Sequence, residues 1–138
     1  MVDRRKFRRS RSKSAGFTLI ELMIVISMIL ILISIAIPIY TQSITRAREA
    51  VLRQNLFTIR SVIDQYSMDK QKAPQSLQDL VGEGYLRAVP LDPITGNDQW
   101  RIIMEDAITS VNQTQPGIFD VRSMSDQKSL EGTPYAEW

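Results

Sequence analysis

The chain has 138 residues, of which 43% are hydrophobic and 23% are charged, and its formal net charge is +2. This length accommodates one modest domain. Because the sequence contains no cysteine and no histidine, disulfides, thiolate nucleophiles and imidazole metal ligands are excluded. With no Gly-rich phosphate loop either, no catalytic pair can be nominated and we expect no enzyme. A solvated surface accounts for the carboxylates that could be imagined as acid–base pairs, namely Asp92, Asp98, Glu105, Asp106 and Asp120.

The positive charge is concentrated at the N-terminus. Residues 1–16 contain seven Lys or Arg residues and one Asp, so this segment carries +6 and the rest of the chain carries −4. A basic cluster directly before an apolar run orients a membrane segment with its basic side in the cytoplasm. We therefore interpret the cluster as an orientation signal and expect no nucleic-acid binding.

An apolar run occupies residues 22–40 and is interrupted only by Ser27 and Ser34. Its length approaches the roughly 20 residues that a helix needs to span a bilayer. We predict a transmembrane helix here, with an irregularity at Pro38. Proline lacks the N–H group of a helical residue, and its ring clashes with the carbonyl four residues earlier.

The helix is expected to continue to about residue 69 with a different character. Apolar residues recur there at steps of three to five, with charged residues between them, which is typical of an amphipathic helix packed on a globular domain. The predicted apolar face consists of Ile44, Ala47, Val51, Leu56, Ile59, Ile63 and Tyr66.

Turn and capping residues follow this helix. Ala73-Pro74 is expected to end it, and Ser76 with Asp79 forms a capping box for a short helix closed by Gly82 or Gly84. Residues 90–96 contain two prolines, an aspartate before proline and a glycine. Such a composition predicts an ordered loop.

Two strands are predicted near the end of the chain. The alternation over residues 100–105 suits a strand that buries Trp100, Ile102 and Met104. In a second strand, residues 118–122, Phe119 and Val121 are predicted to share one face. The polar segment 109–117 would connect the two strands, and the tail 123–138 is expected to be irregular and pinned by Tyr135 and Trp138.

The boundary between the basic cluster and the apolar run carries an unusual carboxylate, Glu21. A charged side chain in hydrocarbon costs about 2.5–3.5 kcal/mol on insertion scales, so its presence invites a functional explanation. The small residue Gly16 lies between the charges and the apolar run, and cleavage after it would expose the α-amino group of Phe17. Two other interpretations are a signal peptide cleaved near Ser34-Ile35-Ala36 and a plain membrane anchor in which Glu21 snorkels.

The segment from Lys13 to Leu22, with Gly16-Phe17-Thr-Leu-Ile-Glu21 at its centre, closely resembles the prepilin signature of type IV pilins and type II secretion pseudopilins. The resemblance implies that a membrane prepilin peptidase cuts after Gly16 and N-methylates Phe17. It also implies that Glu21 recruits and registers subunits during assembly. Glu21 could pair with the amine of Phe17 in its own chain or in a neighbouring subunit, and the sequence leaves both possibilities open.

Val89-Pro-Leu-Asp-Pro93, followed by Gly96 and Trp100, looks like the loop of the G-type major pseudopilin. Many G-type pseudopilins end in a glycine-rich calcium-binding loop, but this chain has Ser123-Met-Ser-Asp126 without the glycines. Ca²⁺ needs six to eight oxygens, and only Asp126 matches a side-chain position of that motif. We therefore expect no cofactor, with Asp126 as the sole calcium candidate.

The sequence thus predicts an α+β fold with a long N-terminal helical spine and a small antiparallel sheet packed on its C-terminal half. The expected divisions are a cleaved leader (1–16), a transmembrane or filament-core segment (17–40) and a periplasmic domain (41–138). The resemblance implies a homopolymeric pseudopilus built from the bacterial inner membrane, acting mechanically in type II secretion. The implied partners are the prepilin peptidase and methylase, an inner-membrane assembly platform with its ATPase, and minor pseudopilins.

Two alternatives stay open at this point. One is a type IV pilin for motility, adhesion or DNA uptake, which shares the same architecture. The other is a membrane-anchored periplasmic enzyme or ligand-binding domain, which would be indifferent to the loss of Glu21.

Overall fold

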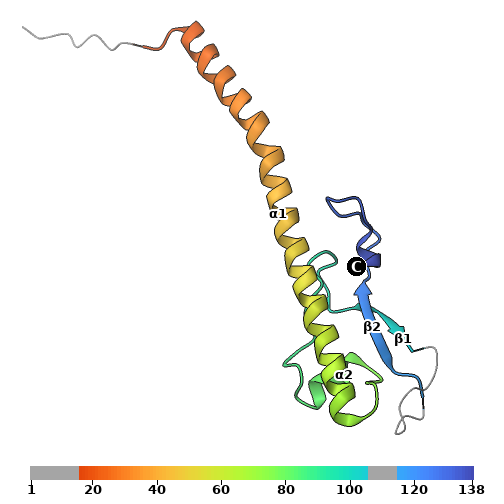
Figure 1. The fold of residues 1–138 in the computed structure, drawn as a ribbon. Helices are drawn as coiled ribbons and strands as arrows, with labels where there is room; N and C mark the ends of the chain where they lie inside the picture. Colours follow the sequence, from red (N-terminus) through yellow and green to blue (C-terminus); the bar gives the residue numbers. More distant parts are fainter. Residues whose placement is uncertain (1–15, 106–114) are drawn as a thin grey trace, which may run out of the picture. The chain divides into compact units, whose positions relative to one another are not determined.

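The computed structural model describes residues 16–105 and 115–138. Its elements are two α-helices, two strands and a short 3₁₀ helix (Figure 1), in the order α1 (Leu19–Lys70), α2 (Leu77–Gly82), β1 (Trp100–Met104), β2 (Ile118–Ser123) and η1 (Tyr135–Glu137). The α+β fold class is therefore confirmed. Most of the predicted connection over residues 109–117 lies outside the described residues. The chain divides into two compact units after Pro38, and each is described by itself.

In the first unit, α1 is apolar on all sides. It is long and apolar enough to cross a membrane, and none of its most apolar stretch is buried. Ser27 does not interrupt the helix, because its Oγ donates a hydrogen bond to the Met23 carbonyl at 2.7 Å. Pro38 lies inside α1, and the predicted irregularity there stays a prediction.

In the second unit, α1 buries one face. The buried apolar positions follow steps of three and four, as a 3.6-residue period requires, and they are Leu52, Leu56, Ile59, Ile63 and Tyr66. The prediction was wrong for the first turns of this face. Val51 is 49% exposed, and Ile44 and Ala47 are exposed as well. Counting back from Leu56 by four residues reaches Leu52, whereas Val51 points about 100° away from it.

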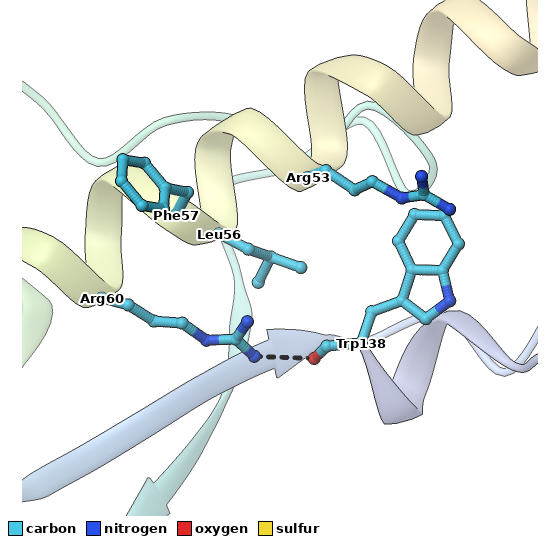
Figure 2. Close-up of a pocket in the computed structure, with 5 residues that line it drawn as sticks. All are labelled: Arg53, Leu56, Phe57, Arg60 and Trp138. Atoms are coloured by element: carbon cyan, nitrogen blue, oxygen red, sulfur yellow. Dashed lines mark hydrogen bonds between the residues drawn. The ribbon is translucent and has the colours of Figure 1, made fainter.

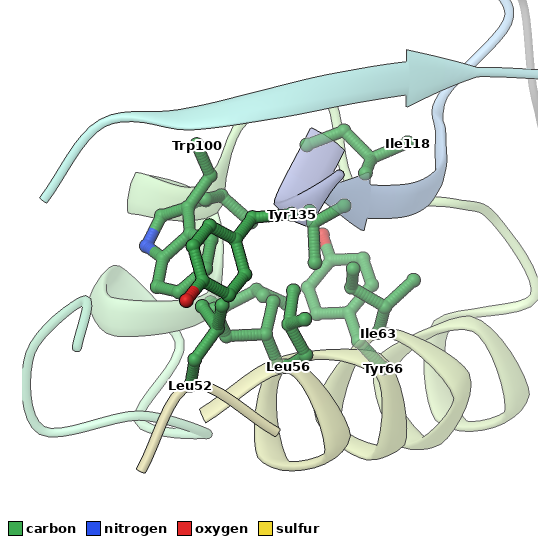
Figure 3. Packing of buried hydrophobic residues seen from close by; sticks show 11 residues of the cluster. Leu52, Leu56, Ile63, Tyr66, Trp100, Ile118 and Tyr135 are labelled. Carbon is green, nitrogen blue, oxygen red and sulfur yellow. The ribbon is translucent and has the colours of Figure 1, made fainter. Parts of the chain in front are cut away.

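The rest of the core comes from four other elements. Figure 3 shows Leu52 and Leu56 of α1 facing Trp100, Ile118 and Tyr135. α2 adds two buried leucines, and Val121 of β2 is fully buried. Residues between the elements also pack against this cluster, among them Tyr85, Leu86 and Val89.

The capping box of α2 is confirmed. Ser76 Oγ accepts a hydrogen bond from the Asp79 N–H at 3.2 Å, and the Asp79 carboxylate accepts one from the Ser76 N–H at 2.9 Å. After Glu83, the C-cap residue, Gly84 adopts a φ of 82°. This left-handed conformation favours glycine, so the predicted end of the short helix is also confirmed.

The sheet contains β1 and β2 in an antiparallel pair, with a register shift between Ile103 and Met104. Ile103 pairs with Asp120 and Met104 pairs with Ile118, so Phe119 is the extra residue of a bulge. The prediction that Phe119 and Val121 share one face of β2 was wrong, because the bulge breaks the two-residue alternation. Ile118 is buried, whereas Phe119 is 67% exposed.

The predicted buried face of β1 was also wrong beyond its first residue. Trp100 is buried, but Ile102 is 41% exposed and Met104 is 46% exposed. The reason is that β2, with Ile118 and Val121, supplies the side chains that cover α1. The register shift then carries the end of β1 out of the regular alternation.

The loop over residues 90–96 is held by a buried carboxylate, as its composition suggested. Asp92 is fully buried, and its Oδ1 accepts a hydrogen bond from the Ile94 N–H at 2.8 Å. Its Oδ2 accepts a hydrogen bond from Ser123 Oγ at 2.5 Å. The Trp100 indole N–H donates to the Pro90 carbonyl at 2.9 Å. These bonds join the loop to both strands.

The tail is pinned by its aromatic residues, as predicted. Tyr135 is buried in the core, and Trp138 packs against the core. Their rings meet edge to face with centroids 5.2 Å apart. An isolated bridge between Lys128 and Pro134 closes the preceding segment.

Candidate processing and assembly site

The beginning of α1 is set by Thr18. The first helical hydrogen bond runs from the Leu22 N–H to the Thr18 carbonyl at 3.1 Å. Thr18 Oγ1 accepts a second hydrogen bond from the Glu21 N–H at 3.2 Å. Thr18 is therefore the N-cap residue, and Glu21 occupies the third helical position, N3.

No role for Thr18 was predicted from the sequence. The signal was present, because Thr-x-x-Glu is the spacing of a capping box. Glu21 also has a local role: a negative charge in the first turn is stabilised by the positive end of the helix dipole, by about 0.3–1 kcal/mol at exposed positions.

Gly16 and Phe17 precede the helix and are accessible. Phe17 is 81% exposed, and a Cβ placed on Gly16 would meet no atom within 4 Å. The peptide bond between these two residues thus lies in an exposed, non-helical segment one residue before the N-cap. A protease can reach a bond in such a position without unwinding α1.

The carboxylate of Glu21 is exposed, and among the described residues it takes part in no ion pair. It is therefore available to an amine outside these residues. The large apolar side chains that follow it up to Tyr40 are exposed too, between 43% and 69%. In water such a surface would aggregate, whereas in a bilayer or among like helices it is covered.

The calcium candidate has a different partner. Asp126 Oδ1 lies 3.2 Å from Arg101 Nη2, and its side chain is 85% exposed. Within residues 16–105 and 115–138, no group of three or more acidic, histidine or cysteine side chains is placed to hold a metal. A guanidinium beside a single exposed carboxylate does not fit a cation that needs six to eight oxygens.

One polar residue of the second unit was missed by sequence reasoning. Glu49 is only 7% exposed, although it looks like one of several charged residues on an amphipathic helix. Its spacing to Leu52 and Leu56 places it on the buried face, and this signal was available in the sequence.

Comparison with known proteins agrees with this geometry. The prokaryotic N-terminal methylation motif matches residues 11–37, which contain the Gly16–Phe17 junction and Glu21. The type II secretion system core protein G of Klebsiella michiganensis is 29% identical over 139 residues, covering 89% of this chain and 90% of that protein. The competence protein ComGC of Halalkalibacterium halodurans is 33% identical over 72 residues, covering 52% of this chain and 71% of that protein.

The chain belongs to the family of type II secretion major pseudopilins. The type IV major fimbrial protein FimA of Dichelobacter nodosus is 40% identical to this pseudopilin, but only over 65 residues, or 47% of the chain and 41% of that protein. Similarity to the core protein G extends over nearly the whole pseudopilin. No solved structure matches the pseudopilin significantly.

Proposed function

We propose that this pseudopilin is cut after Gly16, N-methylated at Phe17 and polymerised from the bacterial inner membrane into a periplasmic filament that acts in type II protein secretion. The observation that carries the proposal is the exposed Gly16–Phe17 bond directly before the N-cap of an apolar helix. Cleavage there removes the basic leader and keeps the whole apolar segment. An ordinary signal peptide would lose that segment.

Assembly follows from the physics of the new N-terminus. A carboxylate left alone in hydrocarbon costs about 2.5–3.5 kcal/mol on insertion scales, and an amine at low dielectric attracts it strongly. We propose that Glu21 pairs with the α-amino group of Phe17 on a neighbouring subunit. This contact registers the helices while their apolar side chains pack together.

The process needs partners that this chain does not supply. The proposed ones are a prepilin peptidase that also methylates, an inner-membrane platform with an assembly ATPase, and minor pseudopilins. The role of this pseudopilin is structural: its repeated copies form the filament, and its globular unit faces the periplasm.

The mass of the mature N-terminus tests the processing step. We expect the mature protein, isolated from its own cells, to begin with N-methylated Phe17. A Gly16→Val variant should keep the leader, because a branched side chain replaces the small residue at the cleavage position. A mature protein that begins at Ile37 would show a signal peptide and overturn the proposal.

Glu21→Ala tests the assembly step. We expect filament yield to fall more than about tenfold, since the lost pairing is comparable to the 2.5–3.5 kcal/mol burial cost and each 1.4 kcal/mol is tenfold. Membrane insertion should persist, as measured by carbonate extraction. Ser27→Ala is the matched control, because that side chain bonds within its own helix. Normal filaments from the Glu21→Ala variant would disprove the role of Glu21.

Deleting the gene separates a secretion pseudopilus from a type IV pilus. We expect exoproteins to accumulate in the periplasm while twitching motility continues. Loss of twitching with intact secretion would favour the pilin function instead.

A further inference from the structure

Glu49 makes long-range contacts from the buried face of α1. Its Oε1 accepts a hydrogen bond from the Leu130 N–H at 2.8 Å and another from the Tyr135 hydroxyl at 2.9 Å. These donors are 81 and 86 residues away in the sequence. One carboxylate therefore joins the helix to two points of the segment 124–138, here called the C-terminal segment.

The C-terminal segment has a compact internal structure. The Ser129 N–H donates to the Thr133 carbonyl at 2.8 Å, and the two hydroxyls of these residues are 3.0 Å apart. The Tyr135 N–H donates to the Gln127 carbonyl at 2.9 Å. These bonds shape the segment as a closed loop, but they do not attach it to α1.

Attachment to α1 comes from Glu49 and from two arginines beyond it. Arg53 lies over the Trp138 ring, with its guanidinium carbon 4.4 Å from the centroid. Arg60 Nη2 donates to the Trp138 carbonyl at 2.8 Å, and Figure 2 shows both arginines reaching from α1 to this residue. The hydrogen bond from the Tyr135 hydroxyl to Glu49 is buried, whereas the Leu130–Glu49 and Arg60–Trp138 hydrogen bonds are only partly buried. Buried hydrogen bonds to a charged group are the stronger kind.

The same segment is where a G-type pseudopilin would place a calcium loop. Here its Asp126 carboxylate is neutralised by Arg101 at 3.2 Å. The Ser125 N–H donates to Ser123 Oγ, and Ser125 Oγ accepts from the Gln127 N–H. The oxygens that would surround a cation are thus used elsewhere or absent from the described residues.

We propose that Glu49 holds the C-terminal segment on α1 in place of a metal ion, so that this pseudopilin folds and stays folded independently of calcium. Glu49 is a positioning residue: it satisfies the Leu130 amide and the Tyr135 hydroxyl, and thereby seats Tyr135 in the core. The inference does not depend on which filament the protein builds, because it concerns the fold of the second unit.

Thermal unfolding of the full chain in detergent micelles tests the proposal, with circular dichroism as the readout. The wild type should unfold at the same temperature in CaCl₂ and in EGTA. Glu49→Ala should unfold at least about 5 °C lower, and equally so in both solutions. Asp126→Asn should match the wild type. If EGTA lowers the unfolding temperature of the wild type and Asp126→Asn abolishes that response, a cation holds the segment and the proposal is wrong.

Limited trypsin digestion shows whether the effect is local, and it applies even if Glu49→Ala is poorly folded. Glu49→Gln keeps the side-chain volume but replaces the charged carboxylate acceptor with a neutral amide. We expect faster cleavage after Lys128 in this variant, with cleavage after Arg87 unchanged. Glu131→Gln is the matched control, since its carboxylate pairs with Arg53 at the exposed surface. Equal cleavage after Lys128 in Glu49→Gln, wild type and control would overturn the positioning role.

Discussion

Among the residues that the structure describes, two carboxylates are buried, and both are satisfied by neutral donors. Glu49 accepts from an amide and a phenol, and Asp92 accepts from two loop amides and a serine hydroxyl. Removing such an acceptor leaves its donors without partners, which costs about 1–3 kcal/mol for each buried group. Neither residue is recognisable as buried from its type, because acidic residues are mostly exposed. The burial of Glu49 is indicated only by its spacing to neighbouring apolar residues, and the burial of Asp92 is seen only in the folded loop.

Tyr135 makes the stability of the second unit sensitive to alkali. Burial, followed by the hydrogen bond to Glu49 and the charge of Glu49, raises the pKa of Tyr135 from 10.0 to about 12. The stabilisation that comes with this raised pKa is complete below pH 10, where the phenol is neutral in both the folded and unfolded states, and it is lost as the pH rises toward 12. We expect the unfolding temperature to fall across this range, as followed by circular dichroism.

The control for this prediction is Tyr135→Phe. The variant should be less stable than the wild type at pH 8, because Glu49 loses a donor. The difference in unfolding temperature between the two proteins should become smaller between pH 10 and 12. Burial also raises the pKa of Tyr66, so some alkaline loss should persist in the variant. A gap that stays constant up to pH 12 would contradict the assignment to Tyr135.

At the level of elements, the sequence predicted the helices better than the sheet. The length of α1, the capping box of α2 and the positions of both strands follow from local patterns, so each could be read from a few consecutive residues. Local patterns could not predict which strand residues point inward, because the bulge at Phe119 results from pairing with β1. The inward-facing residues of β1 and β2 are likewise decided by which strand lies over α1.

Gly117 marks a close approach between two connecting segments that no local pattern predicts. A Cβ at this position would lie 2.5 Å from the Ala73 Cβ and 3.0 Å from the Ala73 carbonyl carbon. Next to it, the Ile118 N–H donates to the Pro74 carbonyl at 2.8 Å. Gly117→Ala should therefore destabilise the second unit by about 1–3 kcal/mol, as overpacking does, and thermal unfolding would measure it.

Gly82→Ala is the comparison, because a Cβ there would meet nothing within 4 Å. It lies at the end of α2, where alanine is the better helix former. We expect it to leave stability unchanged or slightly increased. Equal losses of stability in Gly117→Ala and Gly82→Ala would indicate that the approach of Gly117 to Ala73 does not cause the destabilisation.

For the whole molecule, the excess of basic residues lies in the leader, so removal of the leader would change the sign of the net charge. The full chain has a sequence pI of about 9.1, but residues 17–138 carry a formal charge of −4. Removal of the leader should therefore move the protein from a basic to an acidic isoelectric point. Isoelectric focusing of the membrane fraction would show both forms, and the Gly16→Val variant should give only the basic one. A mature wild-type protein that focuses above neutral pH would contradict cleavage after Gly16.

The contacts of Glu49 also set an order of events during folding. Its partners Leu130 and Tyr135 come 81 and 86 residues after it in the sequence, and closing so long a loop is slow. Until then the hydrophobic face of α1 is incompletely covered. The second unit is thus complete only once the C-terminal segment has docked on α1.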